Sequence, residues 1–175
     1  MPAKTSPTPK GYHTITPYLR VRGAAKALEF YKAAFDAQEL FRLDMGRKIG
    51  HAEFDIAGSR LMLSEEFPEY NAIGPKTLKG TTIALALYVA DADAAMAKAV
   101  AAGAKVRMPA QDMFYGDRSG QIEDPFGHVW SIQQRIEEVS AKEMQERLDA
   151  EIIKARSTGK MAKVITRKPK TRSAA

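Results

Sequence analysis

Two short stretches of the chain carry the side chains best suited to chemistry. The first is Tyr115-Gly116-Asp117-Arg118, in which Arg118 can fork to a carboxylate or a phosphate and Tyr115 offers a hydroxyl and a stacking face. The second is the pair His51 and Glu53, which alternate on a predicted strand and are both metal-ligand types. The first stretch equally suits an internal contact of Asp117 with Arg118 that fixes a loop, so both interpretations stay open.

The other polar candidates give weaker indications. Glu65 and Glu66 follow the end of a predicted strand, where one could act as a base, although such pairs are more often solvated. His13 and His128 are expected at strand edges, and all three histidines, His51 included, are expected first as unrelated surface or hydrogen-bonded imidazoles. The sequence shows no Ser-His-Asp arrangement and no phosphate-cradling glycine loop.

A repeated unit must position these residues. Hydrophobic alternation and helical spacing predict the order strand, helix, strand, strand, strand twice. Leu19 matches Leu87 at an offset of 68 residues, and Gly58 matches Gly127 at an offset of 69. The second unit ends in a hairpin whose turn is Asp124-Pro125-Phe126-Gly127. The predicted strands are 13–21, 39–45, 49–56, 59–64, 83–89, 105–108, 118–123 and 128–134, with helices at 24–35 and from about 91 to 102.

The two faces of the predicted strands differ in character. The outer faces are apolar and are expected to pack on the helices; they comprise Leu19, Val21, Leu61, Leu63, Leu85, Leu87, Trp130 and Ile132. The inner faces mix small, polar and aromatic side chains, which suits the lining of a concave pocket. A merely solvated sheet face is the alternative, and the repeat favours the pocket.

The paired units resemble the vicinal-oxygen-chelate superfamily, which includes glyoxalase I, extradiol dioxygenases and the bleomycin- and fosfomycin-resistance proteins. The first-strand and helix pattern lies in TPYLRVRGAAKALEFYKAAFDA, and the closing hairpin lies in IEDPFGHVWSIQQ. The longer string MFYGDRSGQIEDPFGHVWSIQQRIEEVSAKEM is most similar to the PhnB-like branch. The resemblance covers residues 12–148. It implies an α+β fold in which two βαβββ modules form curved, cup-like mixed sheets with outer helices, in a homodimer with sheet-walled pockets.

Enzymes of this superfamily hold a divalent metal with His and Glu or Gln from four strands. The resemblance puts those positions on Thr16, Met62, Ala84 and Ser131. None of these side chains is a good ligand for zinc, nickel or ferrous iron. We therefore expect no cofactor and no usual catalytic metal, with His51 and Glu53 as the fallback pair if a divalent metal is bound.

The expected function is binding of a small organic ligand in a β-sheet pocket. The alternative is a metal-dependent enzyme, of lyase (glyoxalase) or dioxygenase type, with non-standard ligands; the sequence does not decide whether a reaction is catalysed. The pocket candidates are Thr16, Tyr18, Met62, Ser64, Ala84, Ala86, Tyr115, Asp117, Arg118, Ser131 and Gln133.

Charge and composition bound the remaining roles. The net charge of +6 comes from the basic C-terminal stretch, since residues 1–153 hold more acids than bases. There is no cysteine, no apolar run of membrane length and no secretory leader pattern, so a cytoplasmic protein is expected. The basic stretch lacks aromatic residues and reads as solvated, with weak nonspecific nucleic-acid contact as a further alternative.

The predicted organisation has four parts. Residues 1–11 are a disordered lead-in, 12–136 the folded domain, 137–156 a C-terminal helix and 157–175 a basic disordered tail. Within the domain, module one is 12–66, the connector 65–80 and module two 81–135. Ser140 is expected to cap the C-terminal helix.

Overall fold

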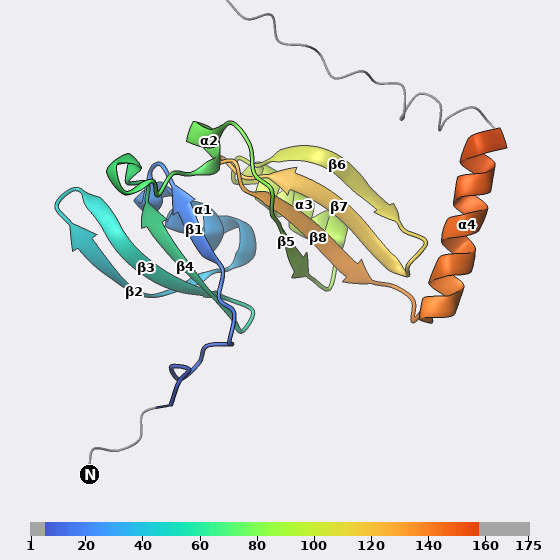
Figure 1. Cartoon of the computed structure of the whole chain (residues 1–175), viewed down its shortest axis with the longest axis horizontal. Helices are drawn as coiled ribbons and strands as arrows, with labels where there is room; N and C mark the ends of the chain where they lie inside the picture. Colours follow the sequence, from blue (N-terminus) through green and yellow to red (C-terminus); the bar gives the residue numbers. More distant parts are fainter. Residues whose placement is uncertain (1–5, 158–175) are drawn as a thin grey trace, which may run out of the picture. The chain divides into compact units, whose positions relative to one another are not determined.

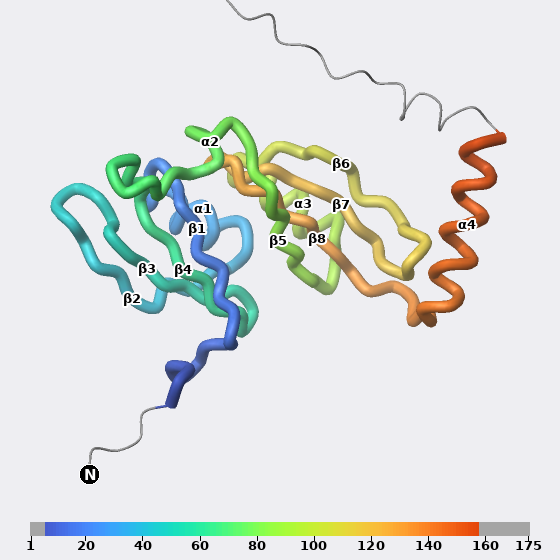
Figure 2. Tube along the Cα trace, viewed as in Figure 1, coloured from blue at the N-terminus to red at the C-terminus, as the bar shows by residue number. Residues whose placement is uncertain are grey.

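The computed structural model describes residues 6–157, which divide into two compact units (Figures 1 and 2). The described part of the first unit comprises residues 6–111 and 118–134, and it holds both sheets. The second comprises residues 112–117 and 135–157, which are a hairpin end and the C-terminal helix. No helix within 6–157 is long and apolar enough to cross a membrane.

The first sheet follows the order β1-β4-β3-β2. Strand β1 pairs in parallel with β4, whereas β2, β3 and β4 pair antiparallel, so the sheet is mixed. Its strands and helix, with the connector elements that follow, are β1 (Tyr18–Val21), α1 (Ala24–Phe35), β2 (Gln38–Met45), β3 (Lys48–Ile56), β4 (Ser59–Glu65), η1 (Pro68–Tyr70) and α2 (Pro75–Leu78).

The second sheet repeats this order as β5-β8-β7-β6. Leu19 pairs with Leu63 in the first sheet, and Leu87 pairs with Ile132 in the second, which preserves the sequence offsets of 68 and 69. The predicted duplication and the fold of two mixed sheets with helices are confirmed. The elements are β5 (Ala84–Tyr88), α3 (Ala92–Ala101), β6 (Lys105–Asp112), β7 (Asp117–Glu123), β8 (Val129–Arg135) and α4 (Ala141–Ser157).

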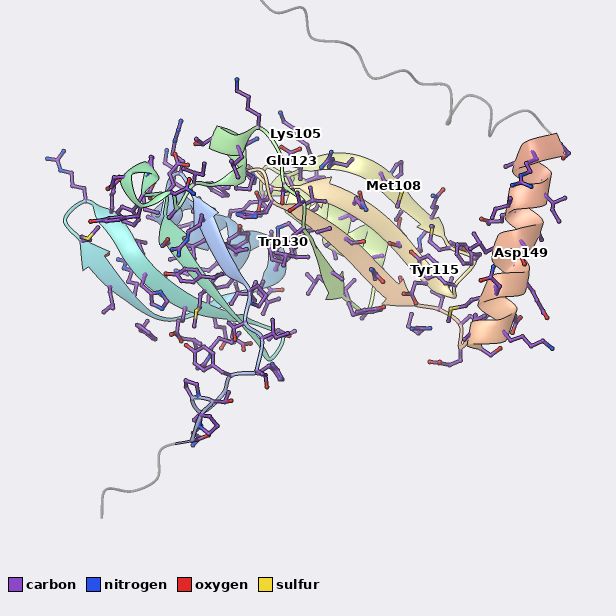
Figure 3. All side chains as sticks on the ribbon, in the orientation of Figure 1. Lys105, Met108, Tyr115, Glu123, Trp130 and Asp149 are labelled. Atoms are coloured by element: carbon purple, nitrogen blue, oxygen red, sulfur yellow. The ribbon has the colours of Figure 1, made fainter. Side chains whose placement is uncertain are left out.

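The core of the first unit forms as the apolar patterns predict. The predicted stripe of α1 is buried, and the outer-face residues of β1, β4 and β8 are buried with it. Leu85 and Leu87 are partly buried and pack against the same cluster. The ring of Tyr31 stacks on Phe54 with centroids 5.2 Å apart, and Trp130, labelled in Figure 3, lies 5.6 Å from Tyr31. In α3, Ala92, Met96 and Ala99 are buried, whereas Val100 is 41% exposed.

Three elements differ most in length from their predictions, and one of them, β6, continues to Asp112 instead of ending at residue 108. The first strand begins at Tyr18 instead of residue 13, because Pro17 has no N–H to continue the ladder. The Pro17 carbonyl still accepts a 2.9 Å bond from the Met62 N–H. The C-terminal helix begins at Ala141, four residues later than predicted, and the Ser140 hydroxyl caps it through the Glu143 N–H at 3.2 Å. Residues 158–175, most of the predicted tail, lie outside the described part.

The second unit is held by contacts between its two segments. The Gly116 carbonyl accepts bonds of 3.0 Å from the N–H groups of Ile136 and Glu137. Arg147 of α4 donates to both carboxylate oxygens of Glu137, at 2.7 and 2.6 Å. None of the residues of α4 is fully buried, but its apolar residues Met144, Leu148 and Ile152 share one stripe and are partly buried.

Candidate functional site

A cavity lined by several candidate residues lies in the first module. Its volume is about 670 Å³, within the range typical of small-molecule sites. Strands β1, β2, β3 and β4 contribute side chains to it, and so does the segment before β1. The residues used below are Tyr12, Thr16, Tyr18, Phe41, Glu53, Arg60 and Met62.

Tyr18 is the first member of a hydrogen-bonded chain beside this cavity. Its hydroxyl lies 2.9 Å from Nδ1 of His51, and Nε2 of His51 lies 3.4 Å from Oε1 of Glu53. A neutral imidazole with its proton on Nε2 faces the carboxylate and leaves Nδ1 to accept from Tyr18. In this arrangement Glu53 orients the His51 ring, and His51 in turn orients the Tyr18 hydroxyl. The order of groups is the same as in a catalytic triad, in which an acid orients a base and the base orients a nucleophile.

Glu53 is the buried charge of this site. It is 6% exposed, and the nearest cation, Nη1 of Arg60, lies 3.8 Å from Oε2. Both this distance and the 3.4 Å contact with His51 are long for hydrogen bonds, so Glu53 keeps acceptor capacity for a donor group of a ligand. Tyr12 stands beside the pair, with the Arg60 guanidinium 4.5 Å from its ring centroid. Burial, with hydrogen bonding to Glu53, raises the pKa of the Tyr12 hydroxyl.

The four superfamily metal positions do not fit a divalent ion. Thr16 and Met62 line the cavity of the first sheet, whereas Ala84 and Ser131 lie on β5 and β8 of the second sheet. Within residues 6–157, no cluster of three or more His, Asp or Glu side chains could hold a metal. The fallback pair His51 and Glu53 is a pair of neighbours engaged with Tyr18 and Arg60, and it offers two ligands where a tetrahedral site needs more.

The candidates of the second sheet form their own face. Ala86 pairs with Ser131, and Tyr88 with Gln133, in the parallel register of β5 and β8. The Gln133 amide lies 3.4 Å from the Ser131 hydroxyl. Ala84 and Ala86 are exposed, so this face presents a shallow row of small side chains.

Ser64 is a support for Arg20 instead of a pocket wall. It is fully buried, accepts a short hydrogen bond from Nη1 of Arg20 and donates to the Glu65 carbonyl at 2.8 Å. Ser64 therefore does not contact a ligand itself, and its role is to hold the Arg20 guanidinium in position.

The structure assigns separate ion pairs to Asp117 and Arg118. Arg118 pairs with Asp93 at 2.5 and 3.0 Å, and Asp117, 1% exposed, pairs with Arg135 at 2.9 Å. Tyr115 lies in the turn between β6 and β7, where it is labelled in Figure 3. These pairs tie β7 to its neighbours, and they favour the structural interpretation of Tyr115–Arg118 over ligand capture.

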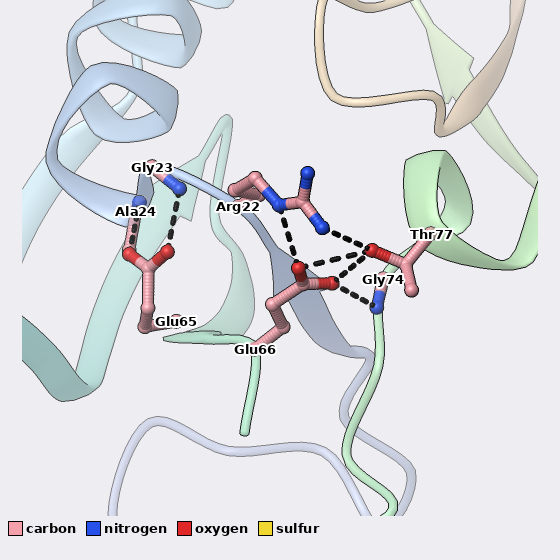
Figure 4. A network of polar contacts seen from close by, with 7 residues as sticks. All are labelled: Arg22, Gly23, Ala24, Glu65, Glu66, Gly74 and Thr77. Atoms are coloured by element: carbon pink, nitrogen blue, oxygen red, sulfur yellow. Dashed lines mark hydrogen bonds and ion pairs between the residues drawn. The ribbon is translucent and has the colours of Figure 1, made fainter. Parts of the chain in front are cut away.

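Glu65 and Glu66 are engaged in structure (Figure 4). Glu65 accepts the N–H groups of Gly23 and Ala24 at 2.7 and 2.9 Å, so it caps α1 from another strand. The carboxylate of Glu66, 5% exposed, accepts from Arg22 at 2.7 Å and from Thr77 at 2.7 Å. Neither glutamate is solvated as expected, and neither carboxylate is available as a base.

Sequence reasoning missed several residues of the cavity. Arg60 and Tyr12 are not among the pocket candidates expected from the sequence, although both line the cavity. Pro7, Thr8 and Pro9 also line the cavity, although the lead-in carries no periodicity that could predict it. The signal for Arg60 was its alternation with Leu61 and Leu63, which puts it on the inner face.

Comparisons with known proteins agree with this architecture. The model of the Glyoxalase/Bleomycin resistance protein/Dioxygenase superfamily matches residues 11–132, and the chain belongs to this superfamily. An uncharacterized protein of Mycobacterium bovis is 40% identical over 135 residues, which cover 75% of this chain and 89% of that protein.

Solved structures show the same fold. The product of an Arabidopsis thaliana gene is 27% identical with a TM-score of 0.58, over 69% of this chain and 98% of that one. A Bacillus cereus protein described as a putative 3-demethylubiquinone-9 3-methyltransferase, PhnB protein, is 20% identical with a TM-score of 0.55, over 70% of this chain and 99% of that one. The expected similarity to PhnB-like proteins is therefore confirmed for the fold.

Proposed function

We propose that this protein binds a small organic molecule in the cavity of the first sheet, without the usual catalytic metal of its superfamily. The observation that carries the proposal is the composition of the wall. Three aromatic side chains, Tyr12, Tyr18 and Phe41, line the same space of about 670 Å³ as the buried Glu53. Such a wall suits a flat, largely apolar ligand that donates one hydrogen bond to Glu53.

The metal positions support the second half of the proposal. Thr16 and Met62 line the cavity and offer a hydroxyl and a soft thioether. Neither side chain supplies the imidazole or carboxylate that a catalytic ion needs. The residues that do carry polar chemistry, Tyr18 and His51, are bonded to each other. Binding should therefore be insensitive to chelators.

We further propose that the working form is a cytoplasmic homodimer. The support is the family fold, together with exposed apolar side chains such as Ile83 beside β5, which is 69% exposed in the single chain. Light scattering during size-exclusion chromatography tests this. The expected mass is twice 19.3 kDa, and a single-chain mass at all concentrations would contradict the dimer.

A fragment screen tests the ligand proposal. Ligand-observed NMR on the full chain in EDTA should yield binders that Met62→Trp abolishes, because the indole fills the cavity. Met45→Trp is the matched control, since Met45 is 55% exposed at the end of β2 and lies outside this wall. Binders retained by Met62→Trp, or a screen that yields none, would contradict the proposal.

A further inference from the structure

A second cavity adjoins the first through Tyr18. Its volume is about 520 Å³, and Tyr18 lines both cavities. The apolar side chains of Ile73 and Leu78 from the connector, and of Ile83 just before β5, form part of its wall. Arg20 of β1 also lines it, and it holds no acidic residue in its lining.

Arg20 differs from the other arginines on the first sheet. Arg22 ion pairs with Glu66 at 2.7 Å, and Arg60 approaches Glu53 at 3.8 Å. Among residues 6–157, no carboxylate lies within ion-pair distance of Arg20, whose interactions are the short bond to the Ser64 hydroxyl and a stack on Tyr18 at 3.8 Å. This half-buried cation therefore lacks a counter-charge in the described chain.

The geometry holds the guanidinium in place for a ligand. Stacking on the Tyr18 ring fixes its plane, and Ser64 takes up Nη1. In the described part of the chain, Nε and Nη2 of Arg20 have no protein acceptor within hydrogen-bond distance. Their N–H groups lie along one edge of the planar guanidinium. That edge matches the two oxygens of a carboxylate.

The remaining polar groups of the wall are neutral. Nε2 of His128 donates to the Arg20 carbonyl at 3.1 Å, so this ring is held beside the strand. Thr81 is engaged with Ile83 through bonds of 3.1 and 3.2 Å, while the exposed Thr82 offers a hydroxyl at the same rim. Arg20 is the single formal charge of the lining, and a ligand that is anionic at one end would complement it.

We propose that this second cavity binds the carboxylate of a small organic acid, with Arg20 as its anchor and the connector side chains against its apolar body. This inference deepens the proposed function by naming the class of ligand, because Tyr18 joins the two cavities. A ligand with its acid group on Arg20 and its ring system past Tyr18 would span both of them.

Benzoate is a suitable probe, with benzamide as its neutral counterpart of the same shape. Isothermal titration of the full chain should show saturable benzoate binding and at least about tenfold weaker benzamide binding, since only the carboxylate complements the fork. Arg20→Met keeps the aliphatic stem and should weaken benzoate binding about tenfold or more. Arg47→Met is the matched control, because Arg47 lies in the exposed turn after β2 and should leave binding unchanged.

Three results would overturn the inference. They are the absence of saturable benzoate binding, equal binding of benzamide, and equal binding by Arg20→Met. Inorganic phosphate should compete only weakly, because it has no apolar body, and phosphate binding as tight as benzoate binding would exclude the proposed class of ligand. If Arg20→Met does not fold, the amide chemical shifts of the wild-type protein provide the test. Benzoate should shift the amide signals of Thr81, Thr82 and Ile83, and unchanged signals at these residues would refute the site.

The failure of this inference is distinct from failure of the proposed function. Fragments from the screen that bind wild type and Arg20→Met equally, but not Met62→Trp, would leave the first cavity as a binding site and remove the anchor. Benzoate binding that is retained by Met62→Trp and lost in Arg20→Met would support Arg20 as the carboxylate anchor of the second cavity, but it would not support ligand binding in the first cavity.

Discussion

The hydroxyl of Tyr31 donates a 2.8 Å hydrogen bond to Oδ2 of Asp124, joining the helix of the first module to the closing turn of the second. Nε1 of Trp130 donates to the same oxygen at 3.0 Å. Oδ1 accepts the N–H groups of Phe126 and His128 at 2.9 Å each. A carboxylate that is 1% exposed thus has four donors, which compensate for its burial.

Tyr31→Phe should therefore destabilise the fold. The change removes one donor from a buried charge and leaves the ring stack in place, so we expect a loss of about 1.5–3 kcal/mol in the free energy of unfolding. Urea denaturation measures it. Tyr70→Phe is the matched control, because Tyr70 is 78% exposed and should change stability by less than about 0.5 kcal/mol. Equal stability of the two variants would contradict the role of Asp124.

Glu66 should make stability depend on acid pH. Burial alone would raise its pKa, but hydrogen bonds from Thr77, Arg22 and the Gly74 N–H outweigh burial and hold the pKa below its usual value. A lowered carboxyl pKa stabilises the fold above the unfolded value of about 4.3, and this contribution is lost as the pH falls through the folded pKa.

Glu66→Gln should flatten the acid part of the stability curve. Chemical denaturation at several pH values between about 2 and 6 measures the slope. Glu69→Gln, an exposed neighbour, should keep the wild-type slope. A Glu66→Gln curve with the same slope as wild type would show that Glu66 does not titrate differently in the folded state.

His128 should make the stability of the fold depend on pH over a higher range than Glu66 does. Burial lowers its pKa, and this effect exceeds the opposing effects of Asp124 and the Arg20 carbonyl. Below about pH 6.5 the unfolded chain takes up a proton that the folded chain does not, so stability should decrease as the pH falls from about 6.5 towards the folded pKa.

The test for His128 is the slope of stability against pH between about 5 and 7. His128→Gln removes the titrating ring and should reduce this slope, whereas His13→Gln, at an exposed position, should not. NMR titration of the His128 ring in the folded protein gives the pKa directly. A value at or above about 6.5 would contradict the burial effect.

Gly116 should be costly to replace. Its φ is +89°, and a Cβ there would lie 2.5 Å from the Glu137 carbonyl oxygen. Gly46 has a φ of +63° with open space around it, so Gly46→Ala pays only the cost of the left-handed backbone, about 1 kcal/mol. Gly116→Ala should cost at least about 1 kcal/mol more in thermal or urea unfolding. Equal losses would show that the close approach to Glu137 relaxes freely.

Local patterns predicted most of the fold. The burial of α1 and the faces of β1 and β4 follow from residue spacing alone, and the offset between Leu19 and Leu87 predicted the repeated order of elements along the chain. The order of the strands within each sheet was not predicted. The turn at Asp124 was evident from its residue types. Its four hydrogen bonds were not, because Tyr31 lies 93 positions away and no spacing rule reports such a contact.

The candidate site was predictable only in part. Thr16, Tyr18 and Met62 were placed on an inner face by alternation, and they do line one cavity. The contacts that define its chemistry depend on which strands are neighbours, since Tyr18 meets His51 across β4. The contacts of Glu66 could not be predicted for the same reason, because its partners Arg22 and Thr77 come from the segment after β1 and from the connector.

The cavity of the first sheet should bind its ligand without a metal ion. Metal content by mass spectrometry tests it, on the untagged full chain loaded with Zn²⁺, Ni²⁺, Mn²⁺ and Fe²⁺ and then desalted. The wall of Thr16, Met62 and Glu53 predicts retention far below one ion per chain, with fragment binding unchanged by EDTA. Retention close to one ion per chain that is lost in a His51→Ala, Glu53→Ala double variant would contradict the account and favour the metal-dependent enzyme.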